Sequence, residues 1–259
     1  MHPRLSLHTI GFGADVTAAE LTAFARESGA PSIGCLASGA VPEEPDVTIA
    51  HLTTAGWFTL DRPERWDEER AALVAIIDHA ARVGAELVYG VTGPAGSLTW
   101  EAAIEALGEA VAPVLEHSRA IGVPLLVETT NVLRQDINVI TTLRDLVTVA
   151  EQTGLAICAD LFWCWREPGL DATIARLAPH TKLVQVSDYV PGIVSMPDRR
   201  VPGDGIVPFE RLLAPFLEHG YAGRFDVELV GPAITAEGPA RAIVRGAEHI
   251  GGILDRLGA

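Results

Sequence analysis

The sequence predicts an α/β protein whose strands close into a (β/α)8 barrel, and three observations support this prediction. Short apolar runs, typical of buried strands, recur eight times along the chain. Most are separated by amphipathic segments, and alternation of strand and helix gives right-handed βαβ units and a parallel sheet. The chain has 259 residues, 48% of them hydrophobic, which suits one α/β barrel. We therefore expect residues 1–259 to form a single barrel domain.

Each predicted strand is a short, mostly apolar run that stops at a polar residue or a turn. The strands are predicted at residues 5–9, 32–36, 47–53, 86–92, 124–129, 155–161, 182–188 and 225–230. The connection between the second and third strands is too short for the usual helix. We therefore expect one helix of the barrel to be missing there.

The predicted helices have apolar residues on one face. Between residues 63 and 84, Leu73, Ile77 and Ala80 recur at helical spacing. Gly122 follows a later segment, at a position where glycine commonly ends a helix. The helices are predicted at residues 17–28, 63–84, 99–122, 137–154, 171–179, 208–220 and 240–258.

Composition excludes several classes of function. The formal net charge is −15, from 34 acidic against 19 basic residues, whereas a nucleic-acid-binding protein normally presents a basic face. No apolar run reaches the ~18 residues that a membrane helix needs. The three cysteines form no CxxC pair, and no signal peptide is evident. We expect a cytoplasmic protein that binds a small-molecule substrate, with no nucleic-acid or membrane partner; homo-oligomerisation is left open.

Polar residues with oxygen donors end four consecutive predicted strands: Glu128, Asp160, Gln185 and Glu228. Catalytic residues of such barrels lie at these carboxyl ends. Converging carboxylates would repel one another, and a divalent cation would relieve that repulsion. Oxygen ligands suit Mn²⁺ or Mg²⁺ best, with Co²⁺ and Zn²⁺ as further candidates. The alternative is that each is only a solvated strand end, but their recurrence in phase with the strands favours a metal site.

Five motifs extend this pattern over nearly the whole chain: GVPLLVE, AICADLFW, LVQVSD, RRVPGDGIVPFERLL and GYAGRFDVEL. In this order they resemble the sugar phosphate isomerase/epimerase family of xylose-isomerase-like TIM barrels. The resemblance implies that Glu128, Asp160, Gln185 and Glu228 hold one divalent metal. It also implies that the two glutamates act as acid and base, and that Arg200 contacts substrate oxygens.

Two positions depart from the family pattern. Gln185 stands where many sugar epimerases have histidine, although glutamine also occurs there and its amide oxygen can bind a metal. Trp163 stands where epimerases often have the histidine of a D–x–x–H motif. Together with Phe162 and Trp165 it predicts an aromatic pocket wall, which is typical of small-molecule sites and argues against a plain ketose substrate. The alternative for these aromatic residues is simple loop packing.

Other features are open to two interpretations. His8 and His51 on predicted strands are candidate substrate-binding residues, although a single histidine in a strand is more often a core group. The 92–97 loop, in the stretch GVTGPAG, could hold a phosphate with backbone amides, but a Gly/Pro turn is favoured. Asp188 should face away from Gln185 and is interpreted as structural.

The preferred hypothesis is a divalent-metal-dependent isomerase or epimerase of a sugar-like hydroxy-carbonyl compound. Glu128 or Glu228 would remove a proton beside the carbonyl, giving a metal-stabilised enediolate, and the other would return one. One alternative is a metal-dependent lyase on a cyclic hydroxy acid or natural product, similar to 3-dehydroshikimate dehydratase. Another is a barrel that has lost its chemistry. An endonuclease would need a histidine-rich metal cluster and a basic groove, and the sequence predicts neither.

Overall fold

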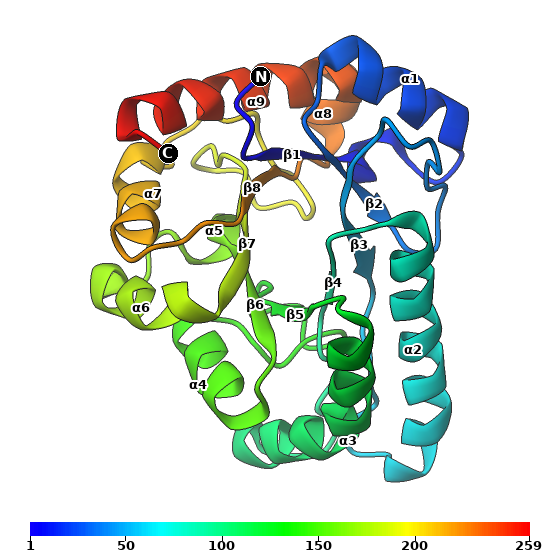
Figure 1. Ribbon diagram of the computed structural model, residues 1–259. Helices are drawn as coiled ribbons and strands as arrows, with labels where there is room; N and C mark the ends of the chain where they lie inside the picture. Colours follow the sequence, from blue (N-terminus) through cyan, green and yellow to red (C-terminus); the bar gives the residue numbers. More distant parts are fainter.

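Eight parallel strands close into a barrel in the computed structural model, which describes residues 1–259 (Figure 1). The strands are arranged in chain order, and the last pairs with the first. Their bounds are β1 Leu5–His8, β2 Ile33–Leu36, β3 Ile49–Thr54, β4 Leu87–Gly90, β5 Leu125–Glu128, β6 Ala156–Asp160, β7 Thr181–Val186 and β8 Arg224–Val227. The predicted (β/α)8 fold is therefore confirmed, with each observed strand inside or beside its predicted range.

The helices surround the strands on the outside of the barrel (Figure 1). The α-helices are α1 Ala18–Ser28, α2 Trp66–Val83, α3 Trp100–Ile121, α4 Leu143–Thr153, α5 Leu161–Cys164, α6 Leu170–Leu177, α7 Phe209–Glu218, α8 Pro232–Glu237 and α9 Pro239–Leu257. Three 3-10 turns complete the set: η1 Thr9–Phe12, η2 Pro63–Arg65 and η3 Ala178–His180. No helix lies between β2 and β3, as predicted. None of the helices is long and apolar enough to cross a membrane.

Helix α4 begins six residues later than predicted, because the residues before it form hydrogen bonds with the ends of other strands. Thr142 caps α4 by accepting a hydrogen bond from the amide of Asp145. Upstream, the fully buried Asn138 donates to the carbonyl of Glu128 at 2.9 Å and accepts from the hydroxyl of Thr92 at 3.0 Å. The segment before α4 thus joins the ends of β4 and β5 instead of extending the helix.

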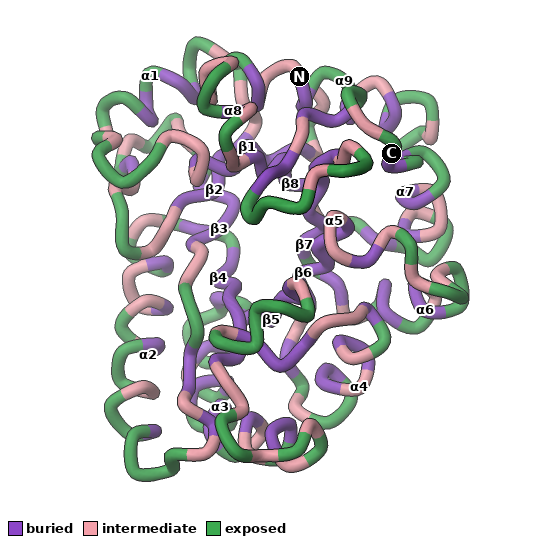
Figure 2. Tube along the Cα trace, turned by 180° about the vertical axis from the view of Figure 1, so that it is seen from behind, coloured by how far each residue is buried: buried purple, intermediate pink, exposed green.

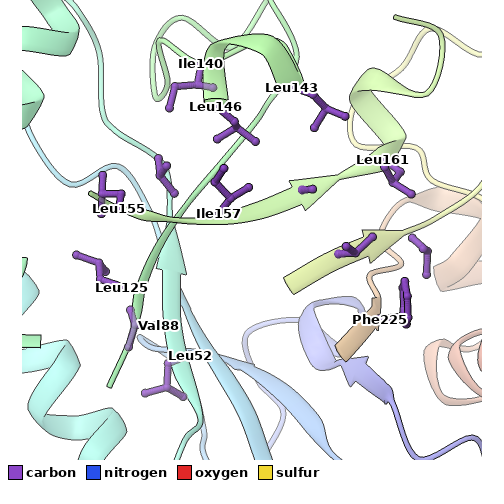
Figure 3. Packing of buried hydrophobic residues seen from close by; sticks show 14 of the residues in the cluster. Leu52, Val88, Leu125, Ile140, Leu143, Leu146, Leu155, Ile157, Leu161 and Phe225 are labelled. Atoms are coloured by element: carbon purple, nitrogen blue, oxygen red, sulfur yellow. The ribbon is translucent and has the colours of Figure 1, made fainter. Parts of the chain in front are cut away.

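The barrel has an apolar outer layer and a mixed interior. Residues that face outward from the strands pack against the helices; Ile157 on β6 points toward Leu146 of α4 (Figure 3). A smaller apolar cluster lies elsewhere in the sheet and is made of Leu87, Tyr89, Leu126, Cys158 and Leu183. Since side chains alternate along a strand, this cluster shares the inward face with the polar residues described below.

The carboxyl end of the barrel is bordered by two exposed loop segments. Residues 132–136 follow β5 and residues 191–197 follow β7. The first segment is exposed and the second mostly so, whereas the strands they follow are largely buried (Figure 2). All strands are parallel, so these two segments lie at the same end of the barrel. That end is where the sequence predicts the functional site.

Candidate active site

Three carboxylates meet at the carboxyl end of the barrel. Glu128 ends β5, Asp160 ends β6 and Glu228 directly follows β8. One oxygen of each lies within 4.8 Å of the others, and all three residues are buried, with exposed fractions of 8%, 0% and 6%. The structure therefore brings together three of the four predicted ligands. These groups could bind a metal ion; the assignment of individual ligands stays a prediction.

A buried arginine that the sequence analysis did not single out occupies the same place. The guanidinium of Arg199 lies 2.7 Å from Asp160 Oδ2 and 2.8 Å from Glu228 Oε2. It also donates to the hydroxyl of Ser187 at 2.8 Å. Its planar fork suits two carboxylates at once. One fixed positive charge therefore faces three acidic groups.

Arg200, the arginine selected from the sequence, lies elsewhere. Its side chain pairs with Asp198, while its backbone forms an antiparallel bridge with Asp188. Neighbouring residues of an extended segment point to opposite sides, so only one of Arg199 and Arg200 can face the carboxylates. None of the contacts of Arg200 supports the predicted substrate role, which stays a prediction.

Asp188 organises the loop that carries Arg199. Its buried carboxylate accepts hydrogen bonds of 2.8–3.0 Å from four backbone amides of this loop, those of Tyr189, Gly203, Gly205 and Val207. A Cβ at Gly205 would overlap the Asp188 carboxylate, so this approach requires glycine. The structural interpretation of Asp188 agrees with these contacts, and the loop places Arg199 over the site.

Two of the three predicted wall aromatics adjoin the site. The guanidinium carbon of Arg199 lies 4.9 Å from the ring centre of Phe162 and 5.3 Å from that of Trp163. The two rings meet edge to face, with their centres 4.6 Å apart. Such distances give favourable cation–π contacts. Trp165 instead packs against the hydrophobic core, which is the alternative considered for it.

Gln185 lies in the barrel interior and makes other contacts than the predicted ones. Its side-chain nitrogen donates to the hydroxyl of Tyr89 at 2.8 Å and to Asp226 Oδ2 at 3.4 Å. Its oxygen accepts from the thiol of Cys158 at 3.3 Å. Both ends of the amide are therefore occupied by groups other than the three carboxylates. The ligand role of Gln185 stays a prediction that these contacts do not support.

His8 is fully buried and its hydrogen bonds fix its tautomer. Nδ1 accepts from the amide of Ile10 at 3.1 Å, so the ring proton is on Nε2. Nε2 lies 3.0 Å from the hydroxyl of Thr53, 2.9 Å from that of Tyr89, and 3.8 Å from Glu228 Oε1. Burial lowers the pKa of His8 to about 3. The imidazole is therefore neutral and lies beside Glu228.

His51 extends this network away from the carboxylates. Its Nε2 lies 3.1 Å from Asp226 Oδ1, and its Nδ1 lies 3.2 Å from the hydroxyl of Thr53. Its ring needs the space beside Gly34, where a Cβ would overlap it. Ligand atoms of His8, His51 and Asp226 also lie within 4.8 Å of one another, but the proton on His8 Nε2 leaves that atom no free lone pair. The network therefore works as hydrogen-bonded support; the predicted substrate roles of both histidines stay predictions.

The loop at residues 92–97 has no free row of amides for a phosphate. The amide of Gly93 donates to the carbonyl of Ile137 at 2.8 Å, and that of Ser97 donates to Asp61 at 3.0 Å. A carboxylate beside the loop would also repel an anion. These contacts agree with the turn that the sequence analysis favoured.

Burial and mutual repulsion disfavour ionisation of the two glutamates. Burial raises the pKa of Glu128 well above its ordinary value, and the charges of Glu228 and Asp160 add to the effect. Burial also raises the pKa of Glu228 to about 8, although Arg199 opposes the change. Without a further cation, both glutamates therefore hold a proton more readily than an exposed glutamate does.

A closed (β/α)8 barrel with an acidic centre at its carboxyl end defines the class of protein. The sequence model of the xylose isomerase-like TIM barrel family matches residues 7–250. The chain therefore belongs to this family. No curated protein sequence is significantly similar to it.

Solved structures with the same fold span the whole chain. The IolI protein with a bound zinc atom has a TM-score of 0.83 at 12% identity, covering 98% of this chain and 99% of that one. L-ribulose 3-epimerase has a TM-score of 0.76 at 15% identity, covering 98% and 95%. A xylose isomerase-like TIM barrel protein from Mycobacterium smegmatis in complex with magnesium has a TM-score of 0.73 at 18% identity, covering 99% and 98%. At these identities the likeness shows the fold alone.

Proposed function

We propose that the protein is a divalent-metal-dependent isomerase or epimerase of a sugar-like hydroxy-carbonyl compound. The observation that supports this most is the meeting of three buried carboxylates within 4.8 Å of one another. Arg199 supplies one positive charge, which leaves the three acidic groups undercompensated. Buried charge without a partner is costly, and a divalent cation would supply the missing compensation.

The donor set fits a hard divalent cation. Glu128, Asp160 and Glu228 offer only oxygen atoms, which Mn²⁺ and Mg²⁺ prefer. Gln185 would join them after turning its amide oxygen away from Cys158. When bound, the cation would stabilise negative charge on substrate oxygens. Relatives of the same fold were crystallised with zinc and with magnesium, which supports a metal in this family without identifying the ion.

The two glutamates are suited to proton transfer. Glu128 on β5 and Glu228 after β8 come from different parts of the barrel wall, so they face the central space from different directions. One would remove the proton beside a carbonyl, and the other would return a proton to the opposite face or to the neighbouring carbon. The neutral His8 lies 3.8 Å from Glu228 and adds no charge beside it.

Phe162 and Trp163 support a substrate with a ring or an apolar appendage. They line one side of the cationic centre and replace a polar donor with aromatic surface. The same wall favours a second candidate, a metal-dependent lyase that removes the same proton and then expels a β-hydroxyl. The negative net charge supports a small molecule, not a nucleic acid, as substrate in either case.

The test is a substrate screen of the metal-loaded protein in D₂O. Mn²⁺ or Mg²⁺ protein is incubated with ketoses, sugar phosphates, glycosides and cyclic hydroxy acids, and products are followed by NMR and mass spectrometry. An isomerase keeps the product mass apart from deuterium incorporation, whereas a dehydratase loses one water. Full turnover by both Glu128→Gln and Glu228→Gln with metal bound would exclude the proposed chemistry.

A further inference from the structure

The position of Arg199 raises a question about metal loading. Its guanidinium makes charged contacts of 2.7 and 2.8 Å with oxygens of Asp160 and Glu228. A second contact with Asp160, from Nη1 to Oδ1 at 3.2 Å, completes a fork on that carboxylate. These are two of the three carboxylates proposed to hold the metal. The arginine and a cation therefore need the same oxygen atoms.

We propose that Arg199 is a built-in counter-cation that competes with the divalent ion for Asp160 and Glu228, so that metal loading requires its guanidinium to leave these carboxylates. This inference rests on the metal site of the proposed function but not on the reaction or the substrate. According to this inference, the Arg199 side chain stabilises the metal-free protein and lowers its affinity for the metal.

The competition follows from the chemistry of arginine. A lysine in this place could lose its proton and remain beside the metal as a neutral amine. The guanidinium stays protonated in proteins, so it would face the cation as a fixed like charge at short range. Repulsion between unit charges a few ångströms apart is strong away from bulk water. Arg199 must therefore move when the cation enters.

Arg199 already contacts groups that are not proposed metal ligands, and these contacts can hold it near the site when it leaves the carboxylates. Phe162 and Trp163 lie at 4.9 and 5.3 Å from the guanidinium carbon and offer two ring faces. Ser187 accepts from Nη1 at 2.8 Å and is not one of the proposed ligands. Arg199 Nε has no hydrogen-bond partner, so rotation of the side chain breaks no hydrogen bond at this atom.

Hydrogen bonds hold the backbone around Arg199, so we expect it to stay in place during this movement. Its amide donates to the carbonyl of Val230 at 3.0 Å, and the adjoining Arg200 is paired with Asp188 through two backbone hydrogen bonds of 2.8 and 2.9 Å. The exchange is therefore a rotation of one side chain and needs no opening of the loop. It should be reversible and fast compared with unfolding.

The experiment compares Arg199→Met with the control Arg200→Met. Methionine keeps the length and the packing against Phe162 and Trp163 but removes the charge. Mn²⁺ affinity is measured by isothermal titration calorimetry at one pH, after removal of metal with a chelator, and thermal unfolding of the metal-free proteins is recorded. We expect Arg199→Met to bind Mn²⁺ at least about tenfold more tightly, and its metal-free Tm to fall by about 5 °C or more. Arg200→Met should leave the Mn²⁺ affinity within about twofold of the wild type.

A second variant keeps the inference testable if Arg199→Met does not fold. Arg199→Lys places an ammonium group beside the carboxylates of the metal-free protein, but this group cannot bridge two carboxylates as a fork and can lose its proton when the metal binds. Its Mn²⁺ affinity should therefore lie between those of the wild type and Arg199→Met. Equal or weaker Mn²⁺ binding in both Arg199 variants would overturn the inference and leave the metal site intact. Absence of Mn²⁺ binding at millimolar concentration in all proteins would overturn both. The expected affinity order without any turnover in the substrate screen would overturn the proposed reaction alone.

Discussion

Each carboxylate of the site could be predicted from the sequence because it interrupts an apolar run. Glu128, Asp160 and Glu228 stand out against the leucine and valine residues before them. Arg199 could not be predicted in this way. The sequence has two adjacent arginines, Arg199 and Arg200, and only the folded loop decides which one faces inward. Asp226 was missed for a related reason: it lies two positions before Glu228 on the same inward face, and nothing in the sequence shows that a histidine lies 3.1 Å away.

Removal of one carboxylate should empty the metal site. Elemental analysis of the wild type is expected to find about one divalent ion per chain, and Asp160→Ala should lose it, because a cation loses both a ligand and local negative charge. The control is Asp78→Ala, whose carboxylate pairs with His117 on the outer helices at 2.7 Å. Full metal occupancy in Asp160→Ala would contradict the ligand assignment.

Trp163 should set the class of substrate. Its indole offers one N–H and a large apolar face where a histidine would donate to a sugar hydroxyl, so Trp163→His should shift preference toward simple ketoses. A pocket contact of this size is worth ~1–3 kcal/mol, or roughly 10- to 200-fold in kcat/KM. The ratio of kcat/KM for a ketose and for a ring-bearing substrate measures it. Efficient turnover of a simple ketose by the wild type would refute the argument without affecting the metal site.

At the scale of elements, periodicity located the strands and most helices, because burial of an apolar face decides both. It did not locate the start of α4, because residues 137–142 satisfy buried hydrogen bonds of β4 and β5 through Asn138. It also gave no hint of α5, a single turn that begins where Asp160 accepts from the amide of Phe162 at 3.0 Å. That turn directs Phe162 and Trp163 toward Arg199, so a local capping contact of a proposed ligand shapes the pocket wall.

The loop after β7 should depend on Asp188. Asp188→Asn places an NH₂ group or a neutral oxygen against four amide donors, so some of these hydrogen bonds are lost or opposed. Hydrogen bonds to a charged group contribute about 1.5–3 kcal/mol each, and partial loss should lower the unfolding free energy by roughly 2–4 kcal/mol in urea titrations. Limited proteolysis should cut within residues 189–207 sooner than in the wild type. The control Asp198→Asn, whose side-chain partners are Arg200 and Ser195, should change the unfolding free energy much less.

At the scale of the whole molecule, the barrel brings residues of five strands into one buried polar region. Glu128, Asp160 and Glu228 form its outer part, and the network of His8, His51 and Asp226 lies beside them. Such a region opposes folding unless protons or cations compensate it. The global stability of the protein should therefore report on the protonation of the site.

The pH dependence of stability should distinguish the contribution of Glu228 from that of His8. The folded pKa of Glu228 is raised to about 8 from an ordinary 4.5, so its stabilising contribution is complete below pH 4.5 and is lost as the pH rises through 8. The folded pKa of His8 is lowered to about 3 from 6.5, so its contribution is present above pH 6.5 and is lost as the pH falls toward 3. The two effects oppose each other between pH 4.5 and 6.5. Above pH 6.5 the loss from Glu228 remains, and Glu128, whose pKa is also raised, acts in the same direction.

The stability of the metal-free protein should consequently fall as the pH rises from 6.5 to 8. Excess Mn²⁺ should reverse the trend, because ionised carboxylates bind the cation more tightly and ligand binding stabilises the folded state. The Tm difference between Mn²⁺-loaded and chelated protein is therefore expected to widen across this window. Asp160→Ala, measured in the same way, should show little widening because its site no longer holds the ion. A constant Tm difference in the wild type from pH 6.5 to 8 would mean that the carboxylates are already ionised without metal, and that Arg199 and the surrounding network compensate them sufficiently.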